Sequence, residues 1–356
     1  MLAAFSTTVA TAQDHSAETE HGSHEEKAFN PAEMILHHIS DSHGFHLWGE
    51  GHSSVTIPLP VILYTENNGV DVFMSSAFHH GEEAVVKGEN TYVLEHNKIY
   101  LANADGTLNY DEEHHATNDK PLDFSITKNV FALLFSASLM LLIFTSVARF
   151  YKREGNVAPK GLASFMEPLI VFVRDEIARP NIGEKKYAKF LPYLLSVFFF
   201  IWINNLLGLI PIFPGSANLT GNIALTMVLA AITMVITNVN GNKDYWKHIF
   251  NTPGVPWWLK YPIPLMPVVE FIGVLSKPFA LMIRLFANIT AGHIIILSLI
   301  SLIFIFENAA WAGLSVPFAL FMNVLELLVA ALQAYIFTLL SALFIGMAVE
   351  EHDHAH

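Results

Sequence analysis

Cysteine is absent from the 356 residues, and charged residues are scarce. Without Cys the protein has no disulfide framework, no thiolate zinc site and no cysteine nucleophile. Asp, Glu, Lys and Arg make up 14% of the residues, whereas a soluble domain carries about 25%. The hydrophobic content of 53% and the mean hydropathy of +0.41 therefore indicate a membrane protein.

The sequence also lacks a nucleotide-binding loop, and its basic residues are unevenly distributed along the chain. The G-x-x-x-x-G-K-[ST] pattern does not occur, so we expect no ATP binding, no cofactor and no catalysis by this chain alone. Residues 1–123 hold 20 Asp/Glu against 4 Lys/Arg and 13 of the 18 histidines, whereas 12 acids face 15 bases from residue 124 onward. The composition predicts an acidic polar region followed by a membrane region.

Residues 1–28 are predicted to combine a signal-like start with a disordered tail. Ala10-Thr11-Ala12 matches the A-x-A pattern of a signal peptidase site, but no basic segment precedes it. A signal remnant and an accidental match both stay open. Residues 14–27 are rich in His and Glu without apolar periodicity, which predicts disorder. The histidines of residues 15–115 support one alternative hypothesis, a membrane-anchored metal-binding sensor.

Residues 29–124 are predicted to form a small β-rich domain outside the cytoplasm. Short runs of β-branched and aromatic residues alternate with turn formers such as Asn67-Asn68-Gly69. The predicted strands are residues 54–57, 61–64, 70–73, 91–94 and 98–101. A short helix is expected at Asn30–Ser42, and the pairs His79-His80 and His114-His115 are interpreted as surface residues.

Residues 125–356 are predicted to form an all-α membrane domain, beginning with a span at Asn129–Ala148. This run has 20 uncharged residues, which matches a hydrocarbon layer of about 30 Å at 1.5 Å per residue. Arg149, Lys152 and Arg153 follow at once, so the positive-inside rule places this end in the cytoplasm and the acidic domain in the periplasm. Residues 161–189 alternate apolar and charged groups, which predicts an interfacial helix on the cytoplasmic surface.

The remaining apolar segments bring the expected number of spans to five. Phe190–Asn242 has no charged residue in 53 positions, so it is predicted to form two helices joined by an outer turn. A basic and aromatic loop follows at Lys243–Tyr261. Pro262–Phe306 and Pro317–Val349 are longer than an upright span needs, which predicts strong tilt. A turn is expected between these two helices, and the C-terminus is then cytoplasmic by parity.

Arg284 is the costliest residue of the membrane region. An Arg at the centre of a spanning helix costs roughly 2.5–3.5 kcal/mol on insertion scales, and it stays charged in proteins. Asn288, four residues later, and Lys277, seven earlier, are predicted to share its face, and Gly292 offers a place for close helix approach. His293, nine residues on, is predicted to face the opposite side.

Two acidic and two amide residues of the membrane region are candidates for an ion pair with Arg284 or for a place in an ion pathway. Glu270 is 14 residues away, about 21 Å along a helix, and is out of reach. Glu326, which shares a face with Gln333, stays open as a salt-bridge partner. Asn205 is compatible with a helix–helix hydrogen bond or with a role in an ion pathway. Ionisable groups inside a membrane indicate function, and His can carry protons near neutral pH. A self-contained transporter or antiporter is a second alternative hypothesis.

Four motifs stand out in residues 124–351: Asn205-Leu206-Leu207-Gly208-Leu209-Ile210-Pro211, Ser276-Lys277-Pro278, Arg284-Leu285-Phe286-Ala287-Asn288 with Ala291-Gly292, and Leu332-Gln333-Ala334-Tyr335-Ile336-Phe337. Together they resemble the a subunit of the membrane sector of F-type ATP synthases. The resemblance implies that the arginine faces a rotating c-ring and separates two proton half-channels. This role falls on Arg284, and the half-channel positions fall on Asn288, His293, Glu326, Gln333, Asn205 and Glu270.

The resemblance also implies partners and a location. We expect c-ring subunits, peripheral-stalk b subunits, other ATP synthase subunits and membrane lipid as partners, no nucleic acid, and the bacterial inner membrane as the site. One departure concerns His293 and Glu326: many bacterial members carry Glu at the first position and His at the second. Because both arrangements pair a base with an acid, the pathway chemistry is expected to survive the exchange. The resemblance does not cover the N-terminal region.

Overall fold

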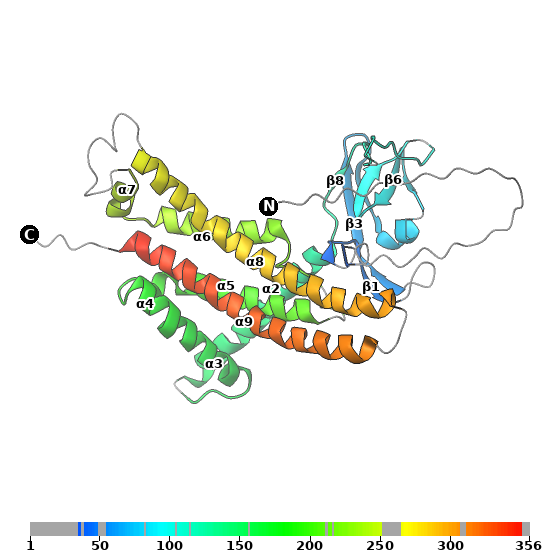
Figure 1. Cartoon of the computed structure of the whole chain (residues 1–356). Coiled ribbons are helices and arrows are strands. Elements are labelled where there is room, and N and C mark those ends of the chain that lie inside the picture. The colour runs from blue at the N-terminus through cyan, green and yellow to red at the C-terminus, as the bar shows by residue number, and fades with distance from the viewer. Residues whose placement is uncertain are drawn as a thin grey trace, which may run out of the picture.

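The structure is a computed structural model that describes residues 35–36, 39–48, 55–81, 83–103, 105–113, 115–155, 157–210, 213–215, 217–250, 265–306 and 311–350. These residues form a small β domain and a bundle of long helices (Figure 1). The tail predicted at residues 1–28 lies outside the described residues. Of the helix predicted at Asn30–Ser42, only Ile35, Leu36 and Ile39 are described as helical.

The β domain contains three small antiparallel sheets. The first pairs β1 (Gly44–Trp48) with β2 (Val55–Pro58). The second has the order β4–β3–β8, with β3 at Pro60–Thr65, β4 at Gly69–Met74 and β8 at Leu122–Asp123. The third has the order β5–β6–β7, with β5 at Val85–Lys87, β6 at Asn90–Glu95 and β7 at Lys98–Leu101. A 3₁₀ segment, η2 (Ser75–Gly81), joins β4 to the third sheet.

Alternation along the strands builds the core of this domain. In β3 the side chains of Val61 and Leu63 are buried, whereas Tyr64 is exposed, because successive residues point to opposite faces. The core residues are Val61, Leu63, Phe73, Phe78, Val85, Tyr92 and Ile99. All five predicted strands are confirmed. β1, β5 and β8 were not predicted, because they are short or carry few β-branched residues, and β8 depends on pairing with β3, which is distant in sequence.

The regular elements described in the second part of the chain are all helices. They are α2 (Lys128–Glu154), α3 (Leu162–Phe172), the π-helical η3 (Val173–Ala178), α4 (Arg179–Ile182), α5 (Tyr187–Leu209), α6 (Ile223–Val239), α7 (Lys243–Phe250), α8 (Leu265–Ile305) and α9 (Ala312–Val349). Among the described residues, four helices are long and apolar enough to cross a membrane: α2, α5, α8 and α9. A fifth span results if α6 and α7, which meet at 104°, count together.

Three predicted boundaries are wrong. The helix expected over residues 161–189 ends at Ile182, where Gly183 takes a positive φ of 90° that favours glycine, and Tyr187 begins the next helix. α7 occupies the first half of the loop expected at Lys243–Tyr261, because Ile249 is buried against the bundle. α9 begins at Ala312 rather than Pro317, so the turn before it is shorter than predicted.

α8 and α9 run side by side in opposite directions, with α5 and α6 packed along them (Figure 1). The β domain lies at the end where α8 meets α9, and the last residues of α9 lie at the other end (Figure 1). At that second end Asn242 donates from its backbone N–H to the Ala348 carbonyl at 2.8 Å, which joins the start of α7 to the end of α9.

The β domain is fastened to the first residues of α2. The N–H of Lys128 donates to the Ser42 carbonyl at 2.8 Å, and the N–H of Asn129 donates to Oδ1 of Asp41 at 3.0 Å. Nε2 of His43, in a side chain that is 4% exposed, lies 3.2 Å from Oδ2 of Asp123. The contacts of the Lys128 and Asn129 N–H groups satisfy donors at the start of the helix that have no partner within it.

Candidate functional site

Arg284 lies on an exposed face of α8. The opposite face packs into the bundle through Leu281, Leu285 and Ile289, each at most 2% exposed. Among the residues that the structure describes, no carboxylate lies within ion-pair distance of the Arg284 guanidinium. Asn288, one turn further on, is also exposed, which confirms that it shares the face of Arg284.

Lys277 keeps the helical position that its spacing from Arg284 predicts, but its side chain is less exposed than that of Arg284. Its side chain is half-buried, and its Nζ lies 5.5 Å from the centroid of the Phe344 ring of α9. A cation is attracted to the face of an aromatic ring, and the apolar stem of Lys packs along the same surface. The seven-residue spacing predicted the position of Lys277 on the helix but not the Phe344 ring that packs against its side chain.

His293 and Glu326 form a buried pair between α8 and α9. Nδ1 of His293 lies 2.8 Å from Oε1 of Glu326, and the two side chains are 15% and 4% exposed. Nε2 of His293 also approaches the Gly208 carbonyl of α5 at 3.4 Å. Glu326 therefore pairs with His293 and not with Arg284, which decides the alternative that the sequence left open.

Gly292 makes this pair sterically possible. A Cβ at this position would lie 2.7 Å from Oε1 of Glu326, a distance that real Cβ atoms essentially never show. The group that approaches Gly292 is the Glu326 carboxylate, the end of a side chain from α9.

Asn205 and Gln333 belong to a second buried network on the same side of α9. Nδ2 of Asn205 donates to Oε1 of Gln333 at 3.0 Å and approaches the Ala330 carbonyl at 3.2 Å. The hydroxyl of Thr220, from the loop between α5 and α6, donates to Oδ1 of Asn205 at 2.6 Å. Sequence analysis missed Thr220, because only the fold brings this loop residue against the α5 helix.

Several buried polar atoms near these networks have no protein partner within the described part of the chain. They are Oδ1 of Asn204, Oγ1 of Thr290, Oε2 of Glu326 and Nε2 of Gln333. Most buried polar atoms in folded proteins bind protein or ordered water. Such atoms inside a membrane bundle are suited to a hydrated route rather than to a dry core.

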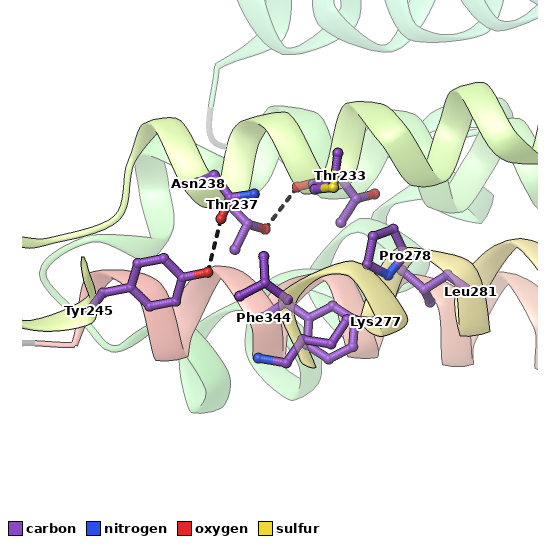
Figure 2. Close-up of a pocket in the computed structure, with 10 residues that line it drawn as sticks. Thr233, Thr237, Asn238, Tyr245, Lys277, Pro278, Leu281 and Phe344 are labelled. Carbon is purple, nitrogen blue, oxygen red and sulfur yellow. Dashed lines mark hydrogen bonds between the residues drawn. The ribbon is translucent and has the colours of Figure 1, made fainter. Parts of the chain in front are cut away.

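Glu270 lies in a different polar region, toward the other end of α8. Its Oε1 is 3.9 Å from Nδ1 of His248 in α7. A cavity of about 20 Å³ lies nearby between α6, α7, α8 and α9, with Asn238, Tyr245 and Lys277 among its polar lining residues (Figure 2). That volume holds about one water molecule. The hydroxyl of Tyr245 donates to Oδ1 of Asn238 at 2.9 Å across this region (Figure 2).

Arg284 thus stands between two polar regions along α8. Lys277 and Glu270 precede it by 7 and 14 residues, and His293 follows it by nine. At 1.5 Å per residue these offsets are about 10, 21 and 14 Å. The predicted site residues are therefore not gathered in one place. Glu326, His293, Gln333 and Asn205 lie on one side of Arg284, and Glu270 lies on the other.

The histidines of the β domain form no comparable centre. His79 and His115 are 64% and 73% exposed, which confirms the interpretation of these two as surface residues. Within the described ranges, no group of three or more His, Asp or Glu side chains is arranged to hold a metal ion. The histidines of residues 14–27 lie outside those ranges.

Long apolar helices, an exposed arginine and buried ionisable groups define a polytopic membrane protein of the ion-conducting kind. A family model described as ATP synthase A chain matches residues 130–346, which is more than half of the chain. The chain belongs to this family and is a component of the bacterial ATP synthase membrane sector. A second model, Domain of unknown function (DUF8433), matches residues 34–124.

Individual relatives agree with this assignment. The chain is 48% identical to ATP synthase subunit a of Chloroherpeton thalassium over 238 residues, which cover 65% of this chain and 69% of that one. It is 48% identical to ATP synthase subunit a 2 of Chlorobaculum tepidum over 240 residues, 65% of each chain. It is 44% identical to ATP synthase subunit a of Myxococcus xanthus over 259 residues, 69% of this chain and 82% of that one. None of these matches supports the transporter or sensor hypothesis.

Proposed function

We propose that Arg284 is the fixed positive charge past which the carboxylates of a c-ring move, in a proton-translocating a subunit of F-type ATP synthase. The observation that carries this proposal is the exposed Arg284 side chain, which has no acidic partner among the described residues, whereas Glu326 is held by His293. A permanent charge on an open face suits a partner that belongs to another chain and changes with rotation.

The chemistry follows from the cost of charge in lipid. A ring carboxylate that faces lipid is protonated, because a bare carboxylate there is very unfavourable. Beside Arg284 the ionised form is favoured, so the carboxylic acid releases its proton. Each unit charge that crosses the membrane potential supplies about 2.3 kcal/mol per 100 mV. The chain itself performs no ATP chemistry, and this energy drives rotation that a separate catalytic head uses.

On the side of the β domain, Glu326 and His293 exchange the proton with water, and Asn205, Gln333 and Asn288 line the route. Three observations support this assignment: the 2.8 Å contact between the acid and the base, their burial, and the neighbouring polar atoms without protein partners. A His–carboxylate pair can pass a proton in either direction, because the ordinary pKa of His lies near neutral pH.

At the end of the bundle away from the β domain, Glu270 and the small cavity beside Lys277 belong to the second route. Tyr245, Asn238 and the cavity of about 20 Å³ support it, since they place polar groups and space for water beyond Arg284. The two routes open at opposite ends of the bundle. Protons can therefore cross only when they are bound to a ring carboxylate that moves past Arg284, which prevents a direct leak between the two routes.

The topology that fits this function has five spans, with α6 and α7 forming the third. The β domain, residues 29–124, is periplasmic, and the membrane domain, residues 125–356, ends in the cytoplasm. The bases support this orientation: Lys186 donates to the Val349 carbonyl at 2.7 Å and Lys189 donates to Oδ1 of Asn240 at 2.6 Å, both at the end away from the β domain. Partners are the c-ring, the peripheral-stalk b subunits and the surrounding lipid.

The test is ATP-driven proton pumping by the complete complex in liposomes. Arg284→Ala is expected to abolish pumping and proton-driven ATP synthesis while the complex still assembles, because the ring carboxylates lose the charge that ionises them. Arg149→Ala, which removes an arginine at the end of α2, is the matched control and is expected to pump normally. Normal pumping by Arg284→Ala would refute the proposed function.

A further inference from the structure

Phe45 of β1 connects the β domain to the membrane bundle. Its side chain is 1% exposed, and its ring centroid lies 5.4 Å from that of Phe131 in α2 and 5.2 Å from that of Phe213. The rings of Phe131 and Phe213 are themselves 5.4 Å apart. Edge-to-face contacts at these distances are favourable beyond the area that they bury. The three rings therefore form one cluster that joins a strand, a helix and a loop.

Phe213 belongs to the loop between α5 and α6, and this loop is unusually well buried. Ala217, Asn218, Leu219 and Thr220 are each at most 6% exposed. A Cβ at Gly215 would lie 2.5 Å from the Ile210 carbonyl oxygen and 2.6 Å from that of Leu207, so the loop lies tightly against the end of α5. Most connecting segments run over the surface, so the burial of residues 217–220 sets this part of the loop apart.

The same loop reaches one of the two buried networks beside Glu326 and packs against the end of α5 that reaches the other, since a Cβ at Gly208 would lie 3.4 Å from the Ala217 carbonyl oxygen. Thr220 donates to Oδ1 of Asn205 at 2.6 Å, and Asn205 donates onward to Gln333 at 3.0 Å. The Gly208 carbonyl, at the end of α5 where the loop begins, lies 3.4 Å from Nε2 of His293. A displaced loop would release both contacts.

We propose that Phe45 is a positioning residue, through which the N-terminal β domain holds the α5–α6 loop where Thr220 reaches Asn205 and the Gly208 carbonyl reaches His293. The inference rests on the proposed function, because it assigns the β domain a role in shaping the proton route on its own side. The domain acts on the route without touching the proton. It does so through a ring contact that lies seven residues before Thr220.

The test is a double-mutant cycle in the complete ATP synthase, with ATP synthesis driven by acidifying the side that carries the β domain. Phe45→Ala and Thr220→Val each lower the rate, by about 2- to 30-fold for a residue that acts through a coupled network. If Phe45 acts through Thr220, the double variant is no slower than the slower single variant. Phe45→Leu, which keeps apolar bulk at the contact, restores most of the rate.

Phe78→Ala is the matched control, because Phe78 is a fully buried ring of the same domain that packs on Phe73 and not on the loop. Its effect is expected to multiply with that of Thr220→Val. If Phe45→Ala prevents assembly, Phe213→Ala replaces it in the cycle, since this ring is 39% exposed and can be truncated from the loop side.

Independent, multiplying effects of Phe45→Ala and Thr220→Val would overturn the inference, as would an unchanged rate in Phe45→Ala. The Arg284→Ala variant in the same assay separates this failure from that of the proposed function. If Arg284→Ala is inactive while the cycle is additive, only the role of Phe45 is wrong. If Arg284→Ala remains active, the proposed function itself fails.

Discussion

Arg284 and the His293–Glu326 pair differ in the kind of partner that each can accept. The guanidinium carries a permanent charge and lies exposed, so its partner can come and go. The pair is buried and internally compensated, with 2.8 Å between Nδ1 and Oε1. A buried charge without a partner is costly, and removing one member of such a pair leaves the other unpaired. The residue type and its burial therefore decide whether a charged group keeps one fixed partner, as Glu326 does, or can change partners, as Arg284 can.

The exchange of acid and base in this pair is directly testable. His293→Gln and Glu326→Gln each remove one titratable group and are expected to lower proton-driven ATP synthesis by about 100-fold, the lower end of the effect of a lost acid–base group. The double variant His293→Glu/Glu326→His restores an acid and a base in contact. We expect it to be clearly faster than either single variant when synthesis rates of the complete complex are compared. A double variant as slow as the slower single would contradict a shared proton function.

At the scale of the elements, small residues decide how closely the helices approach. Gly292 admits the Glu326 carboxylate between α8 and α9, and Gly346 of α9 admits the backbone of Asn181 in α4. The two contacts differ in the group that an added Cβ would displace. A carboxylate at the end of a side chain can shift, whereas a backbone carbonyl can move only together with its helix.

Gly346→Ala is therefore expected to destabilise the bundle, by about 1–3 kcal/mol as for other overpacked cores. The added Cβ would overlap the Asn181 carbonyl oxygen and push α4 away from α9. The thermal unfolding temperature of the purified chain in detergent measures the effect. Gly273→Ala in α8 is the control, because no atom lies within 4 Å of its added Cβ, and Ala favours a helix over Gly by about 1 kcal/mol. Equal unfolding temperatures for the two variants would show that α4 and α9 tolerate the separation.

At the scale of the whole molecule, the junction between the β domain and α2 depends on ionised groups. Burial raises the pKa of Asp123, but the hydrogen bonds that its carboxylate accepts from His43 and Ser125 outweigh burial and hold the pKa below its ordinary value. Nε2 of His43 lies 3.2 Å from Oδ2 of Asp123, and the N–H of Ser125 donates to Oδ1 at 2.8 Å. The ionised form of Asp123 therefore stabilises the folded junction.

The sign of the pH dependence follows from this lowered pKa. The stabilisation is fully present above the unfolded value, about 3.9 for Asp, and is lost as the pH falls through the folded pKa. Asp123→Asn is expected to unfold at a lower temperature than the parent near neutral pH, and the difference is expected to close as the pH falls through the folded pKa of Asp123. Unfolding temperatures of the full chain across pH measure this. The exposed Asp119→Asn serves as control, and a difference that persisted undiminished in acid would contradict a role for the Asp123 charge.

The local sequence pattern predicted many of the helices and strands, because each of these elements depends on a short stretch of chain. Runs of β-branched and aromatic residues predicted the strands at residues 61–64 and 98–101, and run length predicted the helices that contain Asn129 and Arg284. The four-residue spacing placed Asn288 on the face of Arg284. Such features follow from backbone geometry, which repeats every two residues in a strand and every 3.6 in a helix.

Contacts between distant segments were decided only by the tertiary structure. Periodicity gave Glu326 and Lys277 a face, but packing gave them His293 and Phe344 as neighbours. Thr220 joined Asn205, and Phe45 joined Phe213, across stretches of chain that carry no shared pattern. The physical reason is that a helical face can be covered by several elements. Which element covers it depends on how side chains of all the helices fill the space between them.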